Sequence, residues 1–232
     1  MKKLFTLLAL TITFSMNAQW SYNSNGVGIQ SSTNNASGYY STAMGYQTTA
    51  NGGISTAMGR NTTASDYASL VIGQYNSSGS SATSTNLFST SAPAFVIGNG
   101  ADYSNKSDAF KVLFNGDATV SNDLTVSGDV VISSDARLKS NIVSLGSTLP
   151  KLLQIDGKSY EMKGKQKIGV LAQEIKEVFP ELVSEDDNEM LAVNYQGLVP
   201  VLINALKEQD KIIKSQEARL TDIENLIAKL ND

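Results

Sequence analysis

Ser41-Thr42-Ala43-Met44-Gly45 recurs fourteen residues later as Ser55-Thr56-Ala57-Met58-Gly59, and a looser copy follows at Ser69-Leu70-Val71-Ile72-Gly73. The stretches between the copies also align, Tyr46-Gln47-Thr48-Thr49-Ala50 with Arg60-Asn61-Thr62-Thr63-Ala64, and an out-of-phase echo appears at Phe95-Val96-Ile97-Gly98. A small apolar residue at the third position suits the inside of a narrow β-coil, and glycine at the fifth permits a tight turn or close backbone approach. Because such a coil has little apolar bulk, it must stack on its neighbours and on partner chains.

An alternative for this half of the chain is a disordered linker rich in Ser, Thr, Asn and Gly. The repeated pentapeptide at constant spacing favours the coil. Residues 26–73 resemble the β-roll head of trimeric autotransporter adhesins, which carry a similar Ser-x-Ala-x-Gly pattern. The resemblance implies a trimeric head with a mostly uncharged surface, over residues 19–105. Those adhesins end in a membrane anchor, whereas we expect none here once the leader is removed.

Charge is distributed unevenly along the 232 residues, whose formal net charge is -4. Between Ser21 and Gly100 the charged residues are Arg60 and Asp66. This balance disfavours nucleic acid as a partner. The sequence has no cysteine and no histidine, which excludes disulfides, thiolate metal sites and a Ser-His-Asp triad. We therefore expect neither metal nor cofactor, and a nucleophile here would need lysine or a carboxylate as its base.

The first 18 residues read as an export signal. Lys2 and Lys3 precede an apolar run from Leu4 to Phe14, and Asn17-Ala18-Gln19 is a plausible cleavage region. The run is too short to cross about 30 Å of hydrocarbon as a helix. We expect a secreted or cell-surface protein that is cleaved after Ala18.

Alternating apolar residues return after the repeats. Phe110, Val112 and Phe114 alternate, as do Leu124 and Val126, and Asn115-Gly116 and Ser127-Gly128 are turn signals. The pattern predicts a short β-meander or intertwined β-neck over residues 106–133.

An ordered set of motifs follows the predicted neck. It starts with Ser133-Ser134-Asp135-Ala136-Arg137-Leu138-Lys139-Ser140-Asn141-Ile142, continues with Ile168 to Val183, and ends at Val193-Asn194-Tyr195 and Leu198 to Leu202. The apolar spacing of Val170, Ile175, Val178 and Phe179 predicts a short amphipathic helix that stops near Pro180. Taken alone, a serine five residues before a lysine is common. The whole set, however, resembles the endosialidase-type intramolecular chaperones found at the ends of tail spikes and tail fibres.

That resemblance implies a domain at residues 134–196 that trimerises, drives folding of the preceding β-structure and then cuts itself off. The implied cut lies between Ser133 and Ser134, with Ser134 as nucleophile and Lys139 as general base. A lysine base must be neutral, and burial between chains would lower its pKa from about 10.4. Trimerisation would therefore switch cleavage on.

The last segment, residues 197–232, has a heptad pattern. Apolar or glutamine residues recur at alternating spacings of three and four: Leu202, Leu206, Gln209, Ile213, Gln216, Leu220, Ile223, Ile227 and Leu230. Such spacing is typical of a coiled coil, and polar residues at position d can fix register and strand number. The alternative is a lone amphipathic surface helix, but nothing downstream remains to cover four heptads.

Together these patterns predict a mainly β N-terminal half, with a trimeric β-roll head and β-neck, and an α+β C-terminal domain ending in a trimeric coiled-coil helix. We expect an exported homotrimeric fibre that processes itself as a single-turnover serine peptidase with no external substrate. The alternative is a structural surface protein that keeps the domain uncut as a trimer clamp. A sugar-cleaving tail spike is disfavoured, because residues 19–133 contain no glutamate and lack a convincing acid/base pair. The ligand of the fibre, a surface glycan or protein, stays open.

Overall fold

The computed structural model describes residues 21–22, 29–186 and 189–231. These residues divide into two compact units, with the boundary between Val131 and Ile132, and each unit is described here by itself. The predicted leader, residues 1–18, lies outside the described residues. None of the described helices has both the length and the apolar character needed to span a bilayer.

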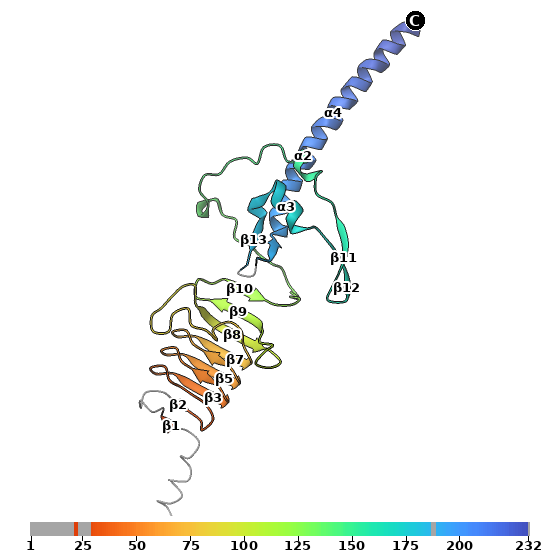
Figure 1. The fold of residues 1–232 in the computed structure, drawn as a ribbon. Helices are drawn as coiled ribbons and strands as arrows, with labels where there is room; N and C mark the ends of the chain where they lie inside the picture. The colour runs from red at the N-terminus through yellow and green to blue at the C-terminus, as the bar shows by residue number, and fades with distance from the viewer. Residues whose placement is uncertain (1–20, 23–28, 187–188, 232) are drawn as a thin grey trace, which may run out of the picture. The chain divides into compact units, whose positions relative to one another are not determined.

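Unit 1 is built on one eight-stranded sheet with the order β1-β2-β3-β5-β7-β8-β9-β10 (Figure 1). Strands β2 to β8 pair in parallel, whereas β1 pairs antiparallel with β2 and the β8-β9-β10 end of the sheet is antiparallel. The strands are β1 Ser21–Tyr22, β2 Ile29–Gln30, β3 Thr42–Tyr46, β5 Thr56–Arg60, β7 Leu70–Gln74, β8 Pro93–Asn99, β9 Asp108–Leu113 and β10 Ala118–Val120. A smaller parallel sheet joins β4, Thr49–Ala50, to β6, Thr63–Ala64.

The fourteen-residue repeats stack in register, which confirms the predicted β-coil. Ala43 pairs with Ala57, and Gly45 pairs with Gly59. The echo at 95–98 takes the same register, since Val71 pairs with Val96. Residues 75–92 are therefore an excursion out of the coil between β7 and β8, after which the chain returns to the stack.

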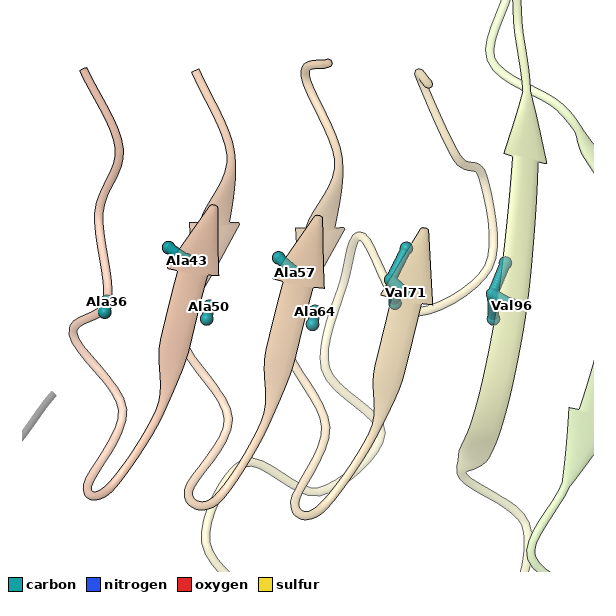
Figure 2. Packing of buried hydrophobic residues seen from close by; sticks show 7 residues of the cluster. All are labelled: Ala36, Ala43, Ala50, Ala57, Ala64, Val71 and Val96. Atoms are coloured by element: carbon teal, nitrogen blue, oxygen red, sulfur yellow. The ribbon is translucent and has the colours of Figure 1, made fainter. Parts of the chain in front are cut away.

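The interior of the coil repeats every seven residues. One small apolar side chain points inward from each half-coil, and the ladder is fully buried: Ala36, Ala43, Ala50, Ala57, Ala64 and Val71, with Val96 beyond the excursion (Figure 2). A second buried ladder with the same spacing is polar: Asn34, Ser41, Thr48, Ser55, Thr62, Ser69 and Asn76. The coil is thus too thin to hold side chains larger than these.

Asparagine ends the polar ladder on both sides. The Asn34 side-chain oxygen accepts a hydrogen bond from the Thr48 backbone N–H at 2.9 Å. At the other end, the Asn76 amide accepts from Thr63 N–H at 2.8 Å and donates to the Thr63 carbonyl at 2.9 Å. Four of the hydroxyls between them bond within their own coil, those of Ser41, Ser55, Thr62 and Ser69, and Ser41 donates to the Gly38 carbonyl at 2.8 Å. The fifth, the buried Thr48 hydroxyl, has no hydrogen-bond partner among the described residues. The longer amide side chains reach the neighbouring coil and satisfy backbone groups there.

The repeated glycines allow the coils to approach each other. Gly59 has φ +116°, and a Cβ built on it would lie 2.0 Å from the Gly73 carbonyl oxygen. A Cβ built on Gly45 would likewise lie 2.0 Å from the Gly59 carbonyl oxygen. A side chain at this column therefore collides with the next coil and strains the backbone.

The predicted neck is realised only in part. Strands β9 and β10 form a hairpin that continues the sheet of unit 1. In the single chain, residues 121–133 contain no strand and Leu124 is 71% exposed, so a strand around Leu124 and Val126 stays a prediction for the assembled neck. A strand needs a neighbouring strand for its backbone groups, and no described strand pairs with the residues around Leu124 and Val126.

Unit 2 packs short elements against the start of one long helix. The elements are η1 Ala136–Leu138, α2 Leu149–Leu152, β11 Lys158–Met162, β12 Lys165–Gly169, α3 Ala172–Val178, η2 Pro180–Leu182, β13 Val183–Glu185, β14 Leu191–Val193, η3 Tyr195–Gly197 and α4 Leu198–Asn231. The helix predicted before Pro180 is α3. Its Ile175 and the following residue, Phe179, meet Val201 of α4 in the core. Two antiparallel hairpins, β11-β12 and β13-β14, complete the unit.

Glu208 of α4 holds the start of α2. Its carboxylate accepts hydrogen bonds from the Ser147 hydroxyl at 2.7 Å and from the Thr148 backbone N–H at 2.5 Å. The Thr148 hydroxyl donates to the Val201 carbonyl at 3.0 Å and is buried. These bonds replace the N-terminal cap that α2 lacks on its own.

Candidate functional site

The site is a tight turn at the beginning of unit 2. Asp135 caps the 3-10 helix η1, because its carboxylate accepts the Arg137 backbone N–H at 2.8 Å. The Leu138 N–H donates to the Asp135 carbonyl, and the Lys139 N–H donates to that of Ala136, both at 3.1 Å. The turn thus reverses the chain immediately after Ser134 and brings back the residue five positions later.

An ion pair closes the same turn. The Arg137 guanidinium donates to both carboxylate oxygens of Asp135, at 3.0 Å from Nε and 2.6 Å from Nη2. Hydrogen bonds from the Arg137 side chain, and then from its backbone N–H, hold the pKa of the Asp135 carboxyl below its usual value. The same contact raises the pKa of Arg137. Asp135 is therefore a turn-forming anion rather than an acid or base.

The turn brings together the two residues predicted to react. The Lys139 Nζ donates a hydrogen bond to the Ser134 Oγ over 2.8 Å. This distance lies within the reach needed for proton transfer between a nucleophile and its base. Ser133, the residue on the other side of the predicted scissile bond, directly precedes Ser134.

Both members of the pair are exposed to solvent in the single chain. In the observed contact lysine is the hydrogen-bond donor, whereas a general base must accept the hydroxyl proton. The pair is therefore placed for reaction, but the described chain supplies nothing that desolvates the lysine.

The predicted heptad residues all lie on α4, which spans 34 residues. Their apolar members are exposed: Leu202 46%, Leu206 65%, Ile213 46%, Leu220 58%, Ile223 50%, Ile227 53% and Leu230 85%. Gln209 and Gln216 are exposed as well. From Gln209 to Leu230, the described chain covers no part of this helix.

Residues 134–184 match the family described as chaperone of endosialidase. The matched segment starts at Ser134 and takes in the turn, α2, the first hairpin and α3. The match supports a chaperone domain of this kind at the start of unit 2. No curated protein matches the chain.

Sequence reasoning assigned no role to Asp135 and Arg137. The signal was present, since an aspartate two residues before a free backbone N–H commonly forms an Asx turn or a cap. Ile203, Ile212 and Leu226 are further exposed apolar residues on α4 that lie outside the predicted seam. Within the described ranges, no three His, Cys, Asp or Glu residues are grouped closely enough to hold a metal ion.

Proposed function

We propose that this chain is an exported, homotrimeric surface fibre, adhesin-like in its head, whose chaperone domain drives trimeric folding and then cuts the bond between Ser133 and Ser134. The observation that carries the proposal is the 2.8 Å contact between Lys139 Nζ and Ser134 Oγ, at the first residue of the matched segment. In this proposal, the fibre is secreted or attached at the cell surface after the leader is removed.

In the proposed reaction, neutral Lys139 removes the proton from Ser134 Oγ, which attacks the carbonyl carbon of Ser133. The peptide C–N bond breaks, the proton passes from Lys139 to the Ser134 nitrogen, and an ester joins the Ser133 acyl group to Ser134 Oγ. Water then hydrolyses the ester to a Ser133 carboxylate and a free Ser134 hydroxyl. One turnover at ~10⁻³ s⁻¹ requires a barrier of only about 21–22 kcal/mol.

Partner chains supply what the single chain lacks. The exposed seam of α4 needs an apolar cover, and a trimer would bury it in successive layers. The outward side of the unit 1 sheet also carries apolar side chains in register, Met44 beside Met58 and Ile72 beside Ile97. Packing of three chains around the turn would desolvate Lys139 and favour the neutral amine.

Self-cleavage is tested by intact mass and N-terminal sequencing of the purified full chain. We expect a 99-residue fragment, Ser134 to Asp232, whose sequence begins Ser134-Asp135-Ala136. Ser134→Ala and Lys139→Ala should each leave the chain uncut. Lys139→Arg should also fail, because a guanidinium stays protonated.

Ser140→Ala is the matched control, since it removes an exposed serine beside the turn, and it should be cut at the wild-type rate. Cleavage of Ser134→Ala at the wild-type rate would contradict the mechanism. A wild-type trimer that is never cut would favour the retained clamp instead. The exposed, proton-donating Lys139 of the single chain is the observation that favours that second function.

Assembly is tested on α4 by light scattering at micromolar concentration. Replacing Ile213 and Leu220 together by aspartate places charges in two seam layers and should give monomers that are not cut. The control puts aspartate at Lys211 and Ala218, which lie at the outward position f of the heptads that begin at Leu206 and Ile213, and should still form trimers. Monomeric wild-type protein would refute the assembly.

A further inference from the structure

Side chains from consecutive coils gather at the turn that follows β3, β5 and β7. Tyr46 and Arg60 stand beside each other in register, at the ends of β3 and β5. The guanidinium carbon of Arg60 lies 5.6 Å from the centre of the Tyr75 ring. The Tyr75 ring meets Tyr103 edge-to-face, with 5.2 Å between centroids. We call this surface the Arg60 corner; it comprises Tyr46, Gln47, Arg60, Asn61, Tyr75 and Tyr103.

Hydrogen bonds fix the outer ring of this corner. The Tyr103 hydroxyl donates to the Asn61 side-chain oxygen and lies 3.4 Å from the Gln47 amide oxygen. Tyr75 and Asn61 are buried, whereas Tyr103 is 62% exposed and Tyr46 is 52% exposed. Two aromatic rings are thus presented to solvent on a base that is held in place.

The corner carries a cation with no ionic partner. Arg60 and Asp66 are the charged residues between Ser21 and Gly100, and Asp66 is fully buried. Among the described residues, no carboxylate forms an ion pair with Arg60. Asp102, in the loop that carries Tyr103, instead accepts hydrogen bonds from Ser104 and Asn105. Lys106, in the same loop, adds a second exposed cation.

These groups match one class of ligand. Exposed tyrosine rings offer a flat apolar face and a polar edge, which suit the C–H face and the hydroxyls of a sugar ring. A guanidinium donates two parallel hydrogen bonds to a carboxylate. A nucleic acid would need a larger basic patch than one arginine and one lysine. An acidic sugar uses the rings and the arginine together.

We propose that the Arg60 corner binds a carboxylate-bearing sugar, with the carboxylate on Arg60 and the ring against Tyr46 or Tyr103. This inference goes beyond the proposed function, because it names the ligand class of the head and does not require cleavage. It assigns attachment to the repeat half of the fibre.

The test titrates full-length protein with a galacturonic acid oligomer and with the methyl ester of the same oligomer. The ester keeps the sugar and loses the charge, so its binding should be weaker by about tenfold or more. Binding of sialyllactose is then compared with binding of lactose, which repeats the test with a second sugar that carries a carboxylate. Calorimetry or ligand-observed NMR gives the dissociation constants.

Arg60→Gln should weaken binding of the acid to the level of the ester. Arg60→Lys should bind the acid with an affinity between those of wild type and Arg60→Gln, because lysine keeps the charge but not the paired hydrogen bonds. Replacing Tyr46 and Tyr103 together by alanine should weaken binding of the acid and of the ester alike. Lys211→Gln is the control, since it removes one exposed cation from α4, and it should bind as wild type. Equal binding of acid and ester, loss of binding in Lys106→Gln but not Arg60→Gln, or no binding of either acid would overturn the proposal.

Discussion

Replacing Gly59 by alanine is the sharpest perturbation of the coil. A Cβ on Gly59 would lie 2.0 Å from the Gly73 carbonyl oxygen, and φ is +116°. Holding an L-residue in such a conformation costs about 1–3 kcal/mol, and forcing an extra group into packed backbone costs about 1–3 kcal/mol more. We therefore expect a loss of about 2–6 kcal/mol, which is a large part of the stability of an ordinary domain.

Two other glycines provide controls with the same substitution. A Cβ on Gly128 meets nothing within 4 Å, so alanine there should change stability by no more than about 1 kcal/mol. Gly53 is intermediate, because its Cβ would lie 3.3 Å from the movable ring of Tyr67. The expected order of destabilisation is Gly59→Ala, then Gly53→Ala, then Gly128→Ala.

The assay is thermal unfolding followed by the β-sheet circular dichroism signal, at one fixed protomer concentration because assembly makes the midpoint concentration-dependent. Gly59→Ala should lower the midpoint by on the order of 10 °C or more, or prevent recovery of folded protein. If Gly59→Ala unfolds at the same temperature as Gly128→Ala, the close stacking of the coils is refuted.

Two further predictions concern buried or linking carboxylates. The buried Asp66 carboxylate accepts hydrogen bonds from the backbone N–H groups of Thr83 and Ser84 at 2.6 and 2.7 Å. Asp66→Ala should therefore lower the free energy of unfolding by about 2–4 kcal/mol and expose residues 80–85 to protease. Asp66→Asn should lower it by less. Hydrogen bonds from the Ser147 side chain, and then from the Thr148 N–H, lower the pKa of Glu208 from 4.5. The Glu208 carboxylate therefore stabilises the fold above pH 4.5, and this contribution is lost as the pH falls through the pKa of the folded state. The urea midpoint should therefore fall less between pH 6.5 and 3.5 in Glu208→Gln than in wild type, and equal falls would contradict the link.

The stacking of the repeats could be predicted because each copy carries the same side chains at the same offset. The seven-residue core was not predicted, since Ala50 and Ala64 lie in two-residue strands that leave no alternating pattern. The excursion formed by residues 75–92 was not predicted either. The length of this segment does not show that the chain returns to the same sheet, although the repeated motif at 95–98 indicated it.

For the candidate site, the reacting pair depended on the resemblance, because serine and lysine five apart are common. The turn that joins them depends on Asp135, whose capping role follows from local chemistry and could have been recognised. The strand expected around Leu124 and Val126 is not formed in the single chain. Alternation of apolar residues predicts a strand only where a neighbouring strand exists, and no described strand pairs with these residues.

The proposed assembly joins features that look unrelated in one chain. Val130, Val131 and Ile132, before the proposed scissile bond, are exposed, as is the seam of α4. Lys139 is exposed as well, although a basic lysine must be desolvated. If partner chains cover residues 130–132, the seam of α4 and Lys139, the apolar burial that drives trimer formation also removes water from the lysine. Cleavage would then report completed folding without a separate sensor, and a variant that trimerises only through α4 should assemble but remain uncut.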